Sequence, residues 1–244
     1  MRLFVAIVPP VAALDEIEAA AGPLREGRPD LRWTSHEAWH VTLAFLGQVS
    51  DVAAGRLMPR LERAAHRHET VALGFAHGGA FPNGTRARVL WTGLQGDHRA
   101  LAALAASVSA GARRAGAPPP DEGRSFLPHL TLARCRAPAD VRPLVAALAG
   151  FAGTPWIADR IHLIRSQPGP RPAYEALASW PLRRRKPDAQ EPACAGEPAR
   201  AEEPARAEEP TRAEEPTRAG EPVRAPSDTP APRSPRPAGT EDQR

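Results

Sequence analysis

The sequence is poor in the features that cross-link a chain or anchor it in a membrane. It has only two cysteines, Cys135 and Cys194, too few for a disulfide framework or a four-cysteine zinc site. The apolar run at residues 3–8 stops at two prolines and is shorter than a signal-peptide core or a membrane span. We therefore expect a cytoplasmic protein without a membrane partner.

The last part of the chain lacks the residues that build a core. Residues 187–244 contain 12 of the 29 prolines and no Leu, Ile, Phe, Trp, Tyr or Met. A six-residue repeat, EPARAE in its clearest copies, runs through residues 191–226. Such a composition cannot offset the entropy of ordering the chain. We predict a disordered tail at 187–244, acting as a spacer or solubilising segment, and one folded domain at 1–186.

Lysine is almost absent, since Lys186 is the only one, and arginine supplies the positive charge. Residues 1–186 hold 24 basic and 15 acidic residues, a net charge of +9, whereas the tail holds 8 and 13, a net charge of −5. A basic domain is typical of proteins that bind polyanions such as RNA. A genome-wide preference for arginine explains the same composition, so charge alone does not decide.

Strand and helix patterns alternate through the predicted domain. The order is strand–helix–strand–helix–strand, run twice, with the two halves meeting near Asn83. Ser50 or Asp51 is expected to cap the second helix, and Asp97 the third, which Gly116 ends. The strands are expected at 3–8, 40–46, 71–81, 87–94, 127–134, 156–166 and 174–180, and the helices at 11–28, 51–68, 97–114 and 141–148.

Each half carries one copy of a His-x-Thr tripeptide on its second strand, HVTL at 40–43 and HLTL at 129–132. Alternate side chains of a strand share a face. His40 and Thr42 should therefore lie on one surface, as should His129 and Thr131, while the aliphatic residues between them point into the core. If the two halves face each other, two imidazoles and two hydroxyls line one groove.

This group of residues suits the cleavage of a phosphodiester without a metal. An in-line displacement needs a base for the attacking oxygen and an acid for the leaving oxygen, and histidine titrates near neutral pH. The threonine hydroxyls can donate to the non-bridging oxygens, and Arg134, five residues after His129, can bind the phosphate in a bidentate way. The residues alone do not say which histidine is the acid.

The segments WHVTLAFLGQV (39–49), RSFLPHLTLAR (124–134) and, more weakly, IRSQPGPRPAYEAL (164–177) resemble the LigT/ThpR-type RNA 2′,3′-cyclic phosphodiesterases, also called 2′-5′ RNA ligases, of the two-histidine phosphoesterases. The third segment departs from the family by extra prolines around Gly169. The resemblance implies an α+β, bilobal, pseudo-twofold fold, with antiparallel sheets lining a central groove and helices outside.

The resemblance also implies hydrolysis of RNA 2′,3′-cyclic phosphate ends to 2′-phosphomonoesters, with His40 as proton donor, His129 as proton acceptor and Arg134 at the phosphate. It implies no cofactor and no metal. Phe45 and Phe126 flank the motifs and are candidates to stack a base. The partner is an RNA with a cyclic phosphate end, and we expect a monomer.

Other interpretations stay open at this stage. A 2′-5′ ligase or a phosphodiesterase for another cyclic phosphate needs the same residues, while an RNA-binding protein without turnover needs neither histidine. A scaffold built around the tail would lose its function without residues 187–244. His36, His66 and His68 are interpreted as ordinary exposed histidines rather than metal ligands, and His162 as a core residue.

Overall fold

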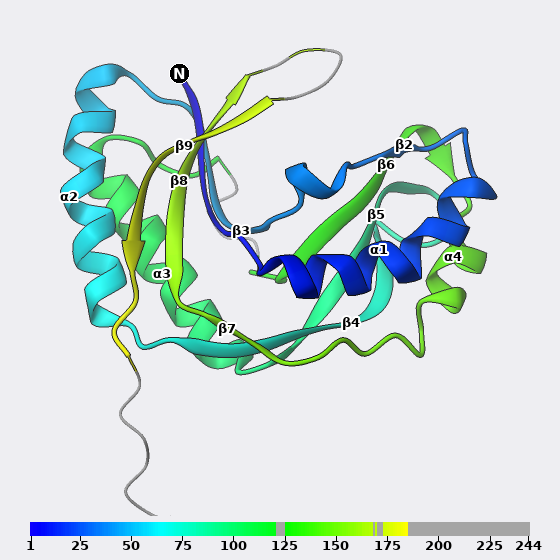
Figure 1. The fold of residues 1–244 in the computed structure, drawn as a ribbon. Helices are drawn as coiled ribbons and strands as arrows, with labels where there is room; N and C mark the ends of the chain where they lie inside the picture. Colours follow the sequence, from blue (N-terminus) through cyan, green and yellow to red (C-terminus); the bar gives the residue numbers. More distant parts are fainter. Residues whose placement is uncertain (121–124, 168, 170–172, 185–244) are drawn as a thin grey trace, which may run out of the picture. The chain divides into compact units, whose positions relative to one another are not determined.

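The computed structural model describes residues 1–120, 125–167, 169 and 173–184 (Figure 1). The predicted tail at 187–244 and most of the proline-rich segment around Gly169 lie outside these residues. The strands are β1 (Arg2–Ile7), β2 (Arg32–Trp33), β3 (Val41–Gln48), β4 (Val71–Phe81), β5 (Ala87–Gly96), β6 (His129–Ala139), β7 (Trp156–Ala158), β8 (Arg160–Gln167) and β9 (Ala173–Pro181). The helices are α1 (Val11–Glu26), the single turn η1 (His36–Ala38), α2 (Asp51–Arg67), α3 (His98–Ala115) and α4 (Arg142–Ala147).

The strands form an antiparallel sheet in the order β7-β4-β5-β6-β3-β1-β8-β9, and β2 pairs with β6. At its centre β3 and β6 share a single residue pair, Val41 with Leu130. This narrow join divides the sheet into a middle half-sheet (β7, β4, β5, β6 and β2) and a terminal half-sheet (β3, β1, β8 and β9). The predicted α+β class with antiparallel strands is confirmed, whereas the bilobal, pseudo-twofold description stays a prediction.

Two pairs of helices cover the two half-sheets (Figure 1). Helices α2 and α3 pack against each other, α3 against β3 and α2 against β9, whereas α1 and α4 pack against β4. No helix in the described part of the chain has both the length and the apolar character needed to cross a bilayer.

Local sequence explains where the helices begin and end. The Ser50 hydroxyl accepts a hydrogen bond from the Ala53 amide at 3.2 Å and caps α2, and the Asp97 carboxylate accepts one from the Ala100 amide at 2.9 Å and caps α3. Gly116 adopts the left-handed conformation, with φ of 85°, that ends α3. The caps predicted at Ser50 and Asp97 and the end at Gly116 are confirmed.

Strand β1 is apolar after Arg2 because both faces of this part are covered. Leu3, Val5 and Ile7 belong to the main core beneath the helices. Phe4 and Ala6 point to the opposite face, where they form a second small cluster with Ile164 of β8. The N-terminal apolar run is therefore a central strand of the terminal half-sheet, and one of its faces lies on the side of the sheet that holds the motif histidines.

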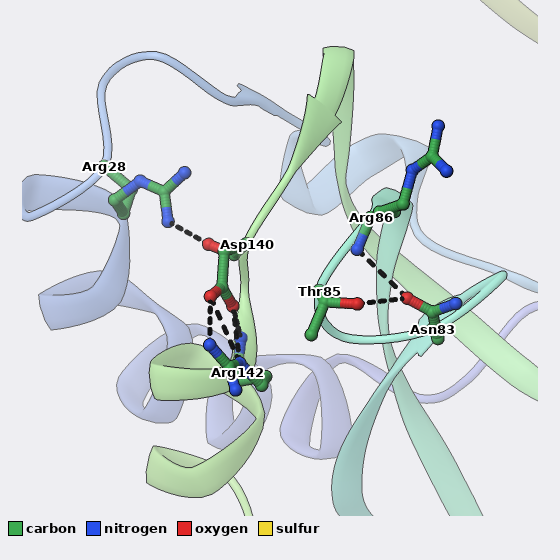
Figure 2. Close-up of polar contacts among 6 residues, drawn as sticks. All are labelled: Arg28, Asn83, Thr85, Arg86, Asp140 and Arg142. Carbon is green, nitrogen blue, oxygen red and sulfur yellow. Dashed lines mark hydrogen bonds and ion pairs between the residues drawn. The ribbon is translucent and has the colours of Figure 1, made fainter. Parts of the chain in front are cut away.

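The predicted junction of the two halves near Asn83 does not match this strand order. Strands β4 and β5 pair with each other up to Phe81 and Val89, so Asn83 lies in the turn of a hairpin inside the middle half-sheet. The Asn83 side-chain oxygen accepts hydrogen bonds from the Thr85 hydroxyl at 2.9 Å and the Arg86 amide at 3.0 Å (Figure 2). The sheet is divided differently because β8 and β9 return to β1 at the end of the described chain.

The same turn is tied to the segment that follows β6. The Val141 amide donates to the Gly84 carbonyl at 2.8 Å. Beside it, the Asp140 carboxylate pairs with Arg142 at 2.7 Å, and its backbone carbonyl accepts from Arg28 at 3.2 Å (Figure 2). Arg142 lowers the pKa of Asp140 to about 2. These contacts fix the outer end of the middle half-sheet.

The single strand predicted at 156–166 is two strands in the structure. Trp156–Ala158 pairs with β4, and Arg160–Gln167 pairs with β1, so the chain passes from one half-sheet to the other at Asp159. A continuous run of strand-forming residues does not reveal such a change of partner, because pairing is a long-range property.

Candidate active site

The two motif strands lie side by side at the centre of the sheet. Because β3 and β6 are antiparallel with Val41 opposite Leu130, His40 lies beside Thr131 and Thr42 beside His129. The two histidines occupy a diagonal, for which a regular ladder gives a spacing of about 7–8 Å. The predicted face assignment is confirmed, since Val41 and Leu130 are fully buried while the histidines and threonines are half-buried.

Each motif strand carries a bulge immediately after its threonine. In β3 the partner of β1 changes from Thr42 to Ala44, and in β6 the partner of β5 changes from Thr131 to Ala133. The extra residues are leucines that stay in the core, so two consecutive positions, Leu-Ala, are buried in both strands. A bulge re-aims the residues that follow it.

As a consequence, Phe45 and Arg134 lie on the same face as the histidines. Each follows its histidine by an odd number of residues, which in a regular strand would place it on the opposite face. They occupy the same position in the two strands, three residues after the motif threonine. One half-sheet therefore presents an aromatic ring and the other a guanidinium group. Strand β6 continues to Ala139, so Arg134 is not at the strand end that the sequence predicted.

The same backbone contact orients both imidazoles. His40 Nδ1 lies 2.8 Å from the Ala38 carbonyl oxygen, and His129 Nδ1 lies 2.8 Å from the Leu127 carbonyl oxygen. A carbonyl only accepts, so each Nδ1 carries the proton that it donates. In the neutral ring, Nε2 then holds the lone pair and is the atom available for proton transfer.

Aromatic rings pack against each histidine. The Phe4 and Tyr174 ring centres lie 4.7 Å and 5.2 Å from that of His40. Phe81 and Trp91 flank His129 at 5.0 Å and 6.1 Å. Sequence reasoning missed these four rings because they come from β1, β9, β4 and β5, and no local pattern predicts which distant strands will be neighbours.

One of these rings depends on a glycine. A Cβ atom on Gly79 of β4 would come within 2.1 Å of the Trp91 ring. The indole thus lies flat against the backbone of its partner strand, where only glycine leaves room for it. Trp91 in turn contacts His129, so a glycine of β4 indirectly sets the position of the imidazole.

A cavity of about 520 Å³ joins these residues, within the usual range for a small-molecule site. Its lining includes the predicted site residues His40, Thr42, Phe45, His129, Thr131 and Arg134, together with Arg2, Phe4, Thr34, Phe81, Ser166 and Tyr174. Phe126 is not in this lining. It lines a neighbouring, more apolar pocket of about 740 Å³ beside α3, which also reaches Phe45, Phe81 and His129.

Burial and positive charge both favour the neutral imidazoles. Burial, opposed by the hydrogen bond to Ala38 and helped by Arg134 and His129, lowers the pKa of His40 from 6.5 to about 4. Burial and Arg134 also lower the pKa of His129. A phosphate bound between the rings would favour the protonated forms and raise both pKa values. The free protein therefore has two neutral imidazoles at pH 7, and a bound anion favours the uptake of a proton from solvent by one of them.

Arg134 supplies a positive charge at one end of the cavity. It is exposed, and no carboxylate among the residues that the structure describes forms an ion pair with it. A guanidinium group in this setting is available to an anionic ligand, and its planar donors match two oxygens of a phosphate.

The other histidines lie apart from this cavity. His36 pairs with Asp15 at 3.2 Å, and His68 lies 2.7 Å from the Ser107 hydroxyl, between α2 and α3. His162 is half-buried in β8. Within the described ranges, no three His, Cys, Asp or Glu side chains come together as metal ligands would.

Comparison with known proteins places this geometry in a family. A family model described as the 2′-5′ RNA ligase superfamily matches residues 9–170. The chain is 30% identical over 183 residues to an RNA 2′,3′-cyclic phosphodiesterase of Geobacillus stearothermophilus, covering 73% of this chain and 56% of that protein. It is 31% identical over 195 residues to one of Thermus thermophilus, covering 75% and 91%.

The chain thus spans little more than half the length of the Geobacillus relative. Among solved structures, E. coli LigT in its apo form superposes with a TM-score of 0.61 at 26% identity, covering 75% of this chain and 98% of LigT. The family model, the relatives and the structural likeness agree with the predicted family. The chain belongs to the 2′-5′ RNA ligase superfamily.

Proposed function

We propose that this protein hydrolyses the 2′,3′-cyclic phosphate at RNA ends to a 2′-phosphomonoester. The observation that carries the proposal is the pair of imidazoles on one cavity, each with Nδ1 bound to a backbone carbonyl and Nε2 left for proton transfer. The names of the Geobacillus and Thermus relatives support the same activity.

In the proposed reaction the cyclic phosphate lies between the two histidines. His129 Nε2 takes a proton from water as the new P–O bond forms, and His40 Nε2 gives a proton to the 3′-oxygen as the P–O3′ bond breaks. His129 ends protonated and His40 neutral, so a proton must return through solvent before the next turnover. Thr42, Thr131 and Arg134 donate hydrogen bonds to the phosphate oxygens, where negative charge builds up.

The two roles differ in what they require of the free protein. His129 as base needs a neutral imidazole, which its lowered pKa provides at pH 7. His40 as acid needs a proton that its pKa of about 4 does not hold at that pH. Binding of the anionic phosphate must therefore raise the pKa of His40 until the ring takes up a proton from solvent.

The direct test uses an oligonucleotide that ends in a 2′,3′-cyclic phosphate, with the product isomer identified by phosphorus NMR. The proposal predicts a 2′-phosphomonoester with wild-type protein and a strongly reduced rate with His129→Gln, which keeps a polar side chain of similar size. Release of the 3′-isomer, or no turnover by well-folded wild-type protein, would falsify it. That the protein is a cytoplasmic monomer stays a prediction from the sequence.

A further inference from the structure

The cavity extends past His40 to a second group of polar residues. Arg2, Ser166 and Tyr174 line it at the end of the terminal half-sheet. Ser166 pairs with Tyr174 across β8 and β9, and the pairing of Leu3 with Arg165 sets Arg2 beside Ser166. Three neighbouring strands thus place a guanidinium, a hydroxyl and a phenol in one row across the sheet.

A row of apolar residues lies between Arg2 and His40, whereas the Tyr174 ring reaches past this row and lies 5.2 Å from the His40 ring. Phe4 is paired with Phe45 on one side and Ile164 on the other, and its ring lies 4.7 Å from that of His40. Arg2 lies two residues beyond Phe4 along β1, which corresponds to about 6–7 Å in an extended strand. The order outward from His40 along β1 is therefore imidazole, aromatic ring of Phe4 and guanidinium of Arg2, with the Tyr174 ring packed against both His40 and Phe4.

Arg2 is exposed and, like Arg134, takes part in no ion pair with the residues described in the structure. The two arginines come from different half-sheets, and they are the arginines in the lining of this cavity. One guanidinium is enough for the reacting phosphate. The second therefore suits another anion of the same ligand, separated from the first by an apolar, base-like moiety.

We propose that Arg2, with Ser166 and Tyr174, binds the phosphodiester that joins the terminal nucleotide to the rest of the RNA, while the terminal nucleoside lies over Phe4. This inference rests on the proposed function and deepens it, because it gives the site a reason to prefer an RNA end over a cyclic mononucleotide. It also agrees with the proposed roles, since the nucleoside would lie on the side of His40, which protonates the ribose oxygen.

The test compares adenosine 2′,3′-cyclic phosphate with the dinucleotide ApA that ends in the same cyclic phosphate. In wild-type protein the KM of the dinucleotide should be about tenfold lower, the size of one charge-assisted hydrogen bond. In Arg2→Gln the ratio of the two KM values should approach one, and Arg2→Lys should restore part of it. Arg99→Gln, an exposed arginine of α3 away from the cavity, is the matched control and should leave the ratio unchanged.

A neutral linkage separates the phosphate contact from other effects. Replacing the internal phosphodiester of the dinucleotide by a methylphosphonate should raise KM in wild-type protein and have no further effect in Arg2→Gln. If Arg2→Gln raises both KM values equally, or if the methylphosphonate costs as much in the variant as in the wild type, the assignment of Arg2 is wrong. Absence of turnover for both substrates would instead contradict the proposed function.

Discussion

The two halves of the candidate site share a backbone and differ in their electrostatics. Both motif strands place a histidine and a threonine on one face, carry a bulge at the following leucine, and direct Nδ1 to the carbonyl two residues earlier. The later positions differ, since β3 provides Phe45 and β6 provides Arg134. The comparison indicates that the shared backbone orients the reacting groups, whereas the differences between the side chains can give each half its own task.

The comparison is tested most strongly by removing each imidazole in turn. His40→Ala and His129→Ala should each lower kcat by about 10²–10⁴, the range for a general acid or base. The double variant should be little worse than either single one, because the two residues act as a unit. Single-turnover kinetics with the cyclic dinucleotide measures this. Wild-type turnover in either single variant would show that its half of the site is not catalytic. An RNA-binding protein without turnover would instead bind RNA and show no hydrolysis in any of the proteins.

The pH dependence separates the two halves by their pKa values. Both histidines have pKa values below 6.5 in the free protein, that of His40 at about 4. The form with one protonated ring therefore becomes scarcer as the pH rises above 6.5, and kcat/KM should fall by about tenfold per pH unit there. The kcat profile should lie at higher pH, because bound phosphate raises both pKa values.

Arg134→Gln provides the control for this prediction. Arg134 lowers the pKa of both histidines, so its removal should move the kcat/KM profile to higher pH, whereas Arg99→Gln should not. A flat profile from about pH 5 to about pH 9, with chemistry rate-limiting, is incompatible with an acid–base pair of histidines.

Much of this site was predictable because it depends on local patterns. The alternation of His, aliphatic residue and Thr placed four polar groups on one face, and the N-caps Ser50 and Asp97 followed from residue type. The bulges left one local sign, the Leu-Ala pair after each threonine, in two strands otherwise expected to alternate. A Leu-Ala pair does not by itself indicate a bulge, so the sequence does not predict the face of Phe45 and Arg134.

Other features could not be obtained from local sequence. The strand order, the change of half-sheet at Asp159, and the rings of Phe4, Phe81, Trp91 and Tyr174 around the histidines depend on pairing between distant segments. Phe126 is close to His129 in the sequence and is therefore predicted to stack a base, yet the structure places it in the neighbouring pocket. Closeness along the chain is a poor guide here because Phe126 precedes β6 and is not part of the strand that carries His129.

Substitutions at the two equivalent positions, Phe45 and Arg134, should have intermediate effects on kcat/KM. Arg134→Gln should lower kcat/KM by about 10–100-fold for every cyclic phosphate substrate, since a hydrogen bond to a charged group contributes about 1.5–3 kcal/mol. Phe45→Ala should weaken the binding of substrates with a base by about 1 kcal/mol. This is the lower end of the range for base stacking, because the Phe45 ring is partly exposed. Ribose 2′,3′-cyclic phosphate, which has no base, should not distinguish Phe45→Ala from wild type. Equal losses for both variants on that substrate would mean that the two positions do not have separate tasks.

The smallest expected effect is that of chelation. In the proposed reaction His129 is the base and His40 is the acid. Arg134 and the two threonines donate hydrogen bonds to the phosphate. Each half of the site thus contributes to the reaction, and no step is assigned to a metal ion. Hydrolysis of the cyclic dinucleotide should therefore keep its rate after dialysis against EDTA, measured beside an enzyme known to need Zn²⁺ as a positive control for the treatment. A loss of activity that added Zn²⁺ or Mn²⁺ restores would mean that water is activated by a metal. His129 would then be a ligand or a positioning residue rather than the base, and the equivalence of the two halves would be one of backbone geometry without a shared chemistry.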